Sequence, residues 1–264
     1  MRPGPIQHPT RLGFFLAVTL VIAAALGSTA LAVPVITGNL EVGIEGRISP
    51  TKLSKRIPTP IILKLKGSIQ TTDGSQVPAL KTLNLQFDKH GTIYTKGLAT
   101  CSVAKLRSTT TSAARAACRP SLIGHGRATA EIYFPEQRPF SAQGPMLIFN
   151  GKPMGRKPVL IIHVYADVPA PTTFVTTGVI GKGHGKYGTA TQIHIPTIVG
   201  GQGSLTGFEA TLGRTWRYRG HRESLLHATC PTGSLFAKGE FDFVNGDRIS
   251  GEIAKRCRGG RGKR

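Results

Sequence analysis

Apolar and polar residues alternate along much of this 264-residue chain, in short runs separated by glycine and proline. In Leu63-Lys64-Leu65-Lys66 every second side chain is apolar, which is typical of a strand with one face toward a core and one toward water. The 33 glycines and 18 prolines mark turns between such runs. The pattern predicts an all-β protein, and an antiparallel β-sandwich-like domain is the usual arrangement for so many short strands.

Two Asn-Gly pairs predict where strands reverse direction. Asn245-Gly246-Asp247 predicts a tight hairpin, because Asn-Gly readily adopts the positive φ angles of such turns. Asn150-Gly151 predicts a turn with a longer connection between Met146 and Ala166. The expected strands are 40–48, 61–71, 80–87, 127–134, 146–149, 159–166, 173–180, 189–195, 205–213, 215–219, 223–228, 240–244 and 248–254.

One segment, from Ser108 to Cys118, departs from the alternation and predicts a short helix. It opens with hydroxyl residues, which cap helices, and continues with alanine, the residue of highest helix propensity. Pro120 follows, and proline ends a helix because it lacks an N–H donor. We therefore expect a helix over residues 112–119 beside the strands.

The N-terminus has the pattern of a secretory signal. Arg2 and Arg11 precede an apolar stretch, residues 12–26, which is shorter than the roughly 20 residues that span a bilayer. Ala30-Leu31-Ala32 then offers small residues for cleavage after Ala32. An uncleaved N-terminal anchor is the alternative. The expected organisation is a signal peptide over 1–32, a β domain over 33–255 and a basic tail over 256–264, with no transmembrane segment after cleavage.

The four cysteines all lie after this signal, and an even number in an exported chain predicts two disulfides. We expect Cys101 to pair with Cys118 and Cys230 with Cys257, because short sequence separations close most readily. A zinc site would need closely spaced cysteine or histidine pairs, so neither a metal nor another cofactor is expected. The cysteines and the signal together predict a secreted or cell-envelope location.

The chain is strongly basic, with 34 Lys and Arg against 13 Asp and Glu and a formal net charge of +21. The signal carries two of these arginines and no acid, which leaves +19 after cleavage. An excess of this size must face water or an anionic partner. Nucleic acid is an improbable partner for an exported chain, and an anionic polymer of the envelope or medium is the more natural one.

The residues around the single tryptophan are the sharpest candidate binding site. Arginine beside aromatic rings suits stacking on sugars and bidentate binding of phosphate or carboxylate. The structural interpretation is a half-buried strand, with Trp and Tyr in the core and the arginines in water. The candidate ligand-binding residues are Arg214, Trp216, Arg217, Tyr218, Arg219 and Arg222.

Other motifs that could indicate catalysis or cofactor binding give only weak signals, and no catalytic residue is assigned. The Gly-rich segment 181–188 is followed by a β run rather than a helix, so it predicts a mobile hairpin loop and not a dinucleotide site. His221 and His227 are expected to be exposed strand histidines. A glycosidase pair would have to come from Glu131, Glu136, Asp167, Glu209, Glu223, Glu240 or Glu252, and nothing selects two of them.

Several of these motifs resemble those of a group of exported bacterial proteins of unknown function. The similarity covers about residues 80–257 and includes segment 212–222, Cys230-Pro231, segment 97–101, Ala116-Ala117-Cys118 and segment 135–140. The resemblance implies export, paired cysteines and an all-β fold, and it assigns no activity.

The sequence favours a non-enzymatic exported protein that binds an anionic polymer through its basic surface. The first alternative is a carrier of a lipid or other apolar ligand held between curved sheets. A hydrolase with an unrecognised carboxylate pair is the second. A large apolar cavity would favour the carrier, and a continuous positive face would favour polymer binding.

Overall fold

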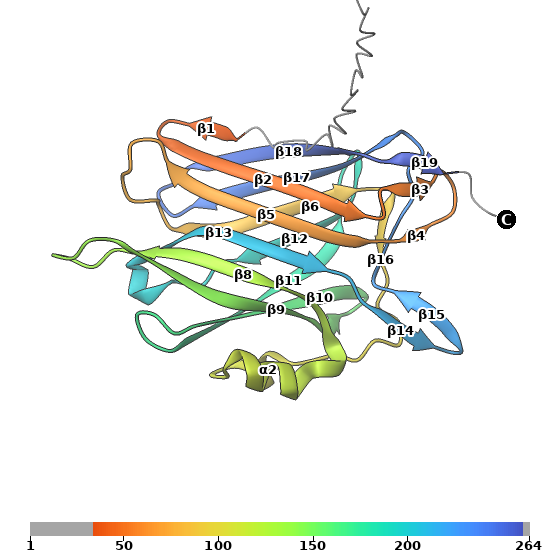
Figure 1. The fold of residues 1–264 in the computed structure, drawn as a ribbon, viewed down its shortest axis with the longest axis horizontal. Helices are drawn as coiled ribbons and strands as arrows, with labels where there is room; N and C mark the ends of the chain where they lie inside the picture. Colours follow the sequence, from red (N-terminus) through yellow and green to blue (C-terminus); the bar gives the residue numbers. More distant parts are fainter. Residues whose placement is uncertain (1–33, 261–264) are drawn as a thin grey trace, which may run out of the picture. The chain divides into compact units, whose positions relative to one another are not determined.

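Strands in which apolar and polar residues alternate need a second layer to cover their apolar face, and here that layer is another part of the same sheet. The computed structural model describes residues 34–260, and twelve strands form one antiparallel sheet (Figure 1). Their order across the sheet is β1 (Val35–Thr37), β2 (Leu40–Ser49), β5 (Ile62–Thr71), β13 (Gly203–Leu212), β8 (Leu122–Ile132), β9 (Phe140–Met154), β10 (Lys157–Ala166), β11 (Thr172–Lys182), β12 (Tyr187–His194), β6 (Leu80–Asp88), β17 (Ser234–Phe243) and β18 (Arg248–Arg256). Segments distant in sequence thus lie side by side, since β13 pairs with β5 and β8, and β6 with β12 and β17.

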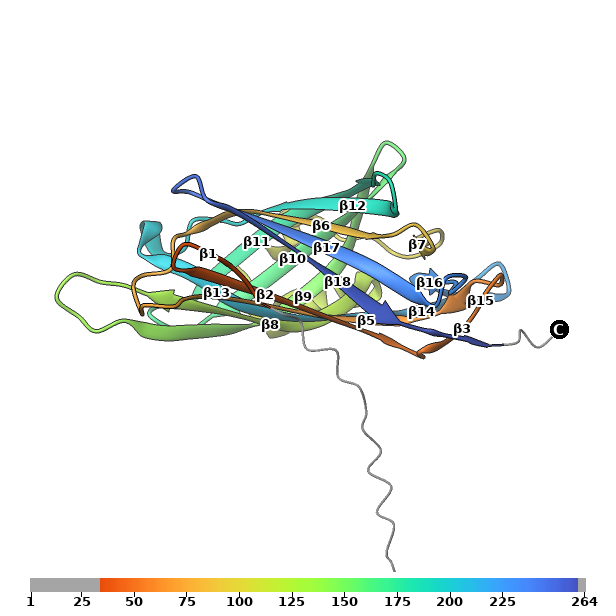
Figure 2. The same cartoon turned by 90° about the horizontal axis from the view of Figure 1, so that it is seen from above.

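The sheet curls until β18 returns to β2, which leaves it nearly closed (Figures 1 and 2). The two strands approach closely where their residues are small: a Cβ atom on Gly46 would lie 2.6 Å from Cδ1 of Ile253. Gly239 of β17 likewise makes room for Ile44 of β2. The prediction of an antiparallel all-β fold with a short helix is confirmed. The facing walls of the expected sandwich belong to one continuous sheet.

A short helical cover lies on the outer face of the sheet. It consists of α1 (Val103–Leu106), α2 (Thr111–Cys118) and the 3₁₀ turn η1 (Arg119–Ser121). The Thr110 side chain caps α2 by accepting a hydrogen bond from the N–H of Ala113 at 3.3 Å. Leu106 of α1 is fully buried together with Phe149 of β9 and Ile161 of β10. The observed helix lies within one residue of the predicted one at either end.

Smaller strands complete the fold at one end of the sheet. β14 (Thr215–Tyr218) and β15 (His221–Ser224) form a hairpin, and β4 (Thr59–Pro60), β16 (Leu226–Ala228) and β7 (Gly91–Ile93) form a three-stranded sheet. β3 (Lys52–Ser54) pairs in parallel with β19 (Arg258–Gly260), and η2 (Val199–Gly201) is a 3₁₀ turn. Every expected strand overlaps an observed one, and the expected strand 223–228 is divided between β15 and β16.

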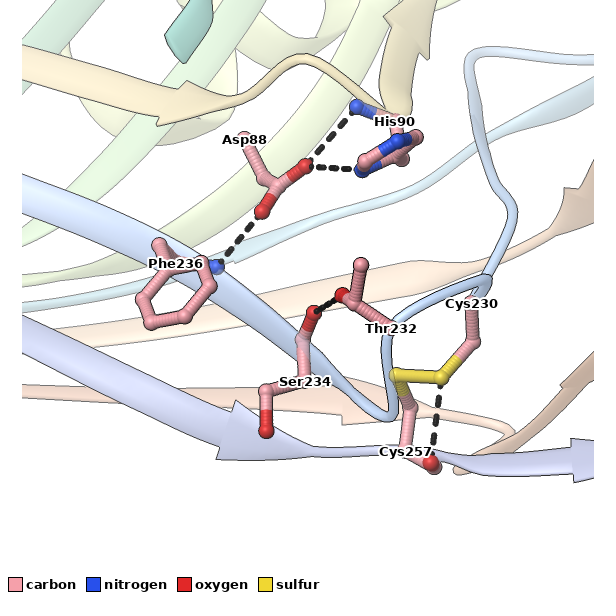
Figure 3. The surroundings of a disulfide bond; sticks show 7 residues. All are labelled: Asp88, His90, Cys230, Thr232, Ser234, Phe236 and Cys257. Atoms are coloured by element: carbon pink, nitrogen blue, oxygen red, sulfur yellow. Dashed lines mark hydrogen bonds and ion pairs between the residues drawn. A yellow bond between two sulfur atoms is a disulfide. The ribbon is translucent and has the colours of Figure 1, made fainter. Parts of the chain in front are cut away.

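Both predicted disulfides are present. Cys101–Cys118 joins the chain just before α1 to the last residue of α2. Cys230–Cys257 joins the segment before β17 to the residue after β18 (Figure 3). Paired cysteines persist in oxidising surroundings, so the two bonds indicate an extracytoplasmic compartment.

The turn predicted at Asn150-Gly151 is wrong. Both residues lie inside β9, and the chain reverses toward β10 at Gly155, whose φ is 58°. Asn150 is buried, and its side-chain amide donates to the carbonyl oxygen of Ala99 at 3.0 Å. Its own carbonyl accepts from the N–H of Cys101 at 2.8 Å. Asn150 therefore anchors the segment that leads to α1, a tertiary role that local sequence does not reveal.

The predicted signal peptide, 1–32, lies outside the described residues, as do residues 261–264 of the predicted tail. Residues 258–260, which the prediction placed in that tail, belong to β19 and extend the ordered fold beyond residue 255. Between residues 34 and 260 no helix is long and apolar enough to cross a membrane.

Candidate ligand-binding cavity

The inner face of the nearly closed sheet keeps exposed apolar surface. On β10, Ile161 and His163 point outward and are almost completely buried beneath the helical cover, with exposures of 2% and 0%. Leu160, Ile162 and Val164 alternate with them and point inward, yet each is only half-buried. Inward side chains that retain exposed surface show that the opposite walls do not fill the interior.

A cavity of about 280 Å³ occupies this interior. Its volume is roughly twice that of a dry cavity of about 150 Å³ that holds benzene in another protein. Most lining side chains are aliphatic or aromatic and come from strands around the whole sheet. They include Leu83, Leu85, Leu160, Ile162, Phe174 and Phe208.

Small residues on two neighbouring strands leave this space open. Ala128 of β8 lies opposite Gly144 of β9, and Ala130 lies opposite Ala142. All four line the cavity, so two successive cross-strand pairs on the inner face have almost no side-chain volume. These residues were not among the predicted site residues. Their signal was the alternation of Gly and Ala in residues 124–130, which marks an inner face without large side chains.

The two ends of the cavity have different linings. At one end, Val168 and Pro169 from the β10–β11 connection and Ile198 from the β12–β13 connection contribute apolar surface. Val168 is 51% exposed, so the apolar lining continues to the surface there. At the opposite end, near the Cys230–Cys257 disulfide, the lining includes Phe87 and Lys255. A ligand in the cavity would thus meet an apolar end and an end that carries a cation.

The aromatic residues predicted to bind a ligand pack against the protein itself. Trp216 stacks on Tyr94 with ring centroids 6.1 Å apart, and its Nε1–H donates to the carbonyl oxygen of Lys96 at 3.0 Å. Tyr218 lies on the same side of β14 and occupies the space above Gly97. This placement agrees with the structural interpretation of the strand. Binding of a ligand by these two rings stays a prediction.

The predicted arginines divide into two groups. Arg214 donates through one terminal nitrogen to the carbonyl oxygens of Arg119, at 3.1 Å, and Leu122, at 2.7 Å. With Arg115 and Arg119, which the sequence did not single out, it lines a shallow hollow of about 480 Å³ beside α2. The other candidates, Arg217, Arg219 and Arg222, are exposed on the β14–β15 hairpin.

His221, His227 and the Gly-rich segment 181–188 lie on strands or in a hairpin between strands. His221 is exposed on β15 and His227 half-buried on β16. Segment 181–188 makes the hairpin between β11 and β12, as predicted, and its Lys186 pairs with Glu252 at 2.7 Å. Within residues 34–260, no three His, Cys, Asp or Glu side chains gather as metal ligands.

Four of the candidate carboxylates have separate partners. Glu252 accepts from Lys186 and Tyr187, which lowers the pKa of its carboxyl, while burial and this carboxylate raise the pKa of Tyr187. Burial, and then the hydrogen bond to Glu131, raise the pKa of Tyr133 to about 12. Elsewhere Glu209 pairs with Lys66 at 3.9 Å and Glu240 with Lys238 at 3.6 Å.

A buried carboxylate, Asp88, organises the end of the sheet near the second disulfide (Figure 3). One oxygen accepts from the backbone N–H of His90 at 2.9 Å and lies 2.7 Å from the Nδ1 of its ring. The other accepts from the N–H of Phe236 at 3.1 Å. One oxygen therefore holds the turn that follows β6, and the other joins the end of β6 to β17.

Comparison with known proteins yields no relative for this fold and cavity: no family model, no curated protein and no solved structure matches the chain.

Proposed function

We propose that this protein binds a lipid chain or another slender apolar molecule inside its curved sheet and acts as an extracytoplasmic carrier, either released or retained in the envelope. The observation that carries the proposal is the apolar cavity of about 280 Å³. Transferring apolar surface from water into such a site contributes about 25 cal/mol per Å². An enclosed apolar wall with few polar groups suits a ligand that water solvates poorly.

The same cavity makes the carrier a better supported function than polymer binding. Trp216 and Tyr218, the aromatic half of the predicted polymer site, are engaged by Tyr94 and Gly97. The exposed arginines still offer charge to an acidic polymer. Such binding would use the outer surface and would leave the cavity without a role.

Filling the cavity tests the proposal directly. Ala128 is half-buried on the inner face of β8, so Ala128→Phe directs a large ring into the space between the walls. We expect the oxidised protein to bind the apolar fluorophore 1-N-phenylnaphthylamine, and Ala128→Phe to weaken that affinity at least about tenfold, equal to 1.4 kcal/mol. Fluorescence titration measures both.

The matched control places the same ring on the outside. Ser141 of β9 is exposed and lies beside the inward Ala142, so Ser141→Phe should leave the affinity within about twofold. Circular dichroism and thermal unfolding establish that both variants are folded. If the wild-type protein fails to bind the fluorophore, and organic extraction of the purified protein yields no apolar molecule, the carrier proposal is wrong.

A further inference from the structure

An unpaired lysine lies on the cavity face of the sheet, and its position points to the chemical class of the ligand. Lys255 is near the end of β18 and lies on the same face of this strand as the inward Ile249 and Ile253. It lines the cavity and is half-buried. Whereas Lys186 and Lys238 pair with Glu252 and Glu240, no ion pair joins Lys255 to a carboxylate among residues 34–260.

The strand register fixes the face on which this side chain lies. Lys255 is directly opposite Leu235 of β17, and Ile253 is opposite Ala237. Residues directly opposite one another in an antiparallel pair project from the same face of the sheet. Leu235 is a buried core residue and Ala237 lines the cavity. The Lys255 side chain therefore leaves β18 on the cavity side of the sheet rather than toward the outer surface.

Three other titratable residues border the cavity, and each either points away from it or is already hydrogen-bonded within the protein. Arg47 lies opposite Lys64 and both are exposed, which places them on the outer face of β2 and β5. The two oxygens of Asp88 are occupied by His90 and Phe236. His227 alternates along β16 with the buried Leu226 and Ala228, so its ring lies on the other side of that strand.

A single cation at the end of an apolar chamber matches an amphiphile with one anionic head. The apolar chain gains by leaving water, while a headgroup next to Lys255 gains a charge-assisted hydrogen bond in a partly desolvated position. A carboxylate is the simplest head that fits one ammonium group, whereas a neutral ligand would leave that ammonium without a counter-charge.

We propose that the ligand of the cavity is an anionic amphiphile of the fatty-acid class, whose carboxylate pairs with Lys255 while its chain extends toward Val168. This inference rests on the proposed carrier function. It adds a selectivity, acid over neutral chain, that the apolar lining alone would not give.

The experiment compares two ligands that differ only in the head. Dodecanoate and 1-dodecanol are each titrated, below their aggregation concentrations, against protein loaded with 1-N-phenylnaphthylamine. We expect wild-type protein to bind dodecanoate about tenfold more tightly than dodecanol. Lys255→Met keeps the length and apolar volume of the stem and should reduce this ratio to about one. Lys255→Arg should preserve it.

The matched control removes a charge of the same sign from the outside. Lys64 is exposed on the outer face of β5, so Lys64→Met lowers the net charge equally and should retain the tenfold preference. If the fluorophore binds and both ligands displace it equally well from wild-type protein, Lys255 serves only to keep its ammonium in water and the fatty-acid assignment is wrong. Absence of fluorophore binding, together with an organic extract that contains no apolar molecule, would instead overturn the carrier proposal itself.

Discussion

At the scale of single residues, His163 is a titratable side chain that the fold buries completely. It is fully buried on β10 under the segment before α2, and its Nε2–H donates to the carbonyl oxygen of Thr109 at 3.0 Å. Its Nδ1 is buried without a partner. Burial lowers the pKa of this imidazole from its ordinary value of 6.5, because the charged form would lose its hydration.

This burial predicts a loss of stability in acid. Below pH 6.5 the unfolded chain binds a proton at His163 that the folded protein resists, so the free energy of unfolding falls as the pH falls toward the lowered folded-state pKa. The slope contributed by this residue is at most about 1.4 kcal/mol per pH unit. Urea unfolding between pH 7 and pH 5 measures it.

His163→Met should remove this contribution, since methionine fills a similar space and does not titrate. His125, exposed on β8, supplies the control, and His125→Gln should retain the wild-type dependence on pH. An identical slope in wild type and His163→Met would show that other groups cause the acid sensitivity.

At the scale of elements, the β14–β15 hairpin is held against the body by close contact at one glycine. Gly97 has φ of 74°, and a Cβ atom there would overlap the ring of Tyr218. Trp216 stacks beside this contact on Tyr94. Trp216 and Tyr218, which were predicted to bind a ligand, thus hold the hairpin against the rest of the protein, and the hairpin arginines Arg217, Arg219 and Arg222 are exposed to water.

Gly97→Ala should therefore loosen the hairpin. Both the left-handed backbone and the overlap with Tyr218 disfavour a side chain, and we expect a loss of about 1–3 kcal/mol in the free energy of unfolding. The single tryptophan, Trp216, lies beside this contact, so its fluorescence emission should shift toward longer wavelength as the hairpin loosens and water reaches the ring.

Gly181→Ala is the control for that measurement. Gly181 lies on β11, its φ is not in the left-handed region, and a Cβ atom there would lie 3.9 Å from the nearest atom. Its substitution should therefore change stability by less than about 0.5 kcal/mol. Unchanged stability and emission in Gly97→Ala would show that the hairpin does not need this contact.

At the scale of the whole molecule, apolar and cationic surfaces are separated. The interior of the nearly closed sheet is mostly apolar, while most lysine and arginine side chains between residues 34 and 257 are exposed. A carrier built this way would keep its ligand from water and still be attracted to anionic surroundings.

The charge predicts salt-dependent binding to an acidic polymer. If the exposed hairpin arginines contribute, the double substitution Arg217→Gln and Arg222→Gln should weaken the affinity for such a polymer. It should also lower the number of ions released on binding by about two, which makes the affinity less dependent on salt. Titrations at several salt concentrations measure this. Arg47→Gln with Lys64→Gln removes the same charge from β2 and β5 as a control, and an affinity that does not change with salt would contradict polyanion binding altogether.

The sequence by itself determined the elements, because their signals are local. Every strand predicted from the period-2 alternation overlaps an observed one, although the short strands β1, β3, β4, β7 and β19 were not predicted. Alanine and Pro120 located the helix, and short separations paired Cys101 with Cys118 and Cys230 with Cys257. The same local reasoning misplaced the turn at Asn150, whose conformation depends on hydrogen bonds with residues about 50 positions away.

Only the tertiary structure decided that the strands form one curled sheet around a cavity. That outcome depends on pairings such as β13 between β5 and β8, and on which residues face one another across the interior. Ala128, Ala142 and Gly144 are ordinary small residues in the sequence, and Lys255 is one of many cations. They become cavity wall and candidate headgroup site because strand pairing and curvature place them on the inner face.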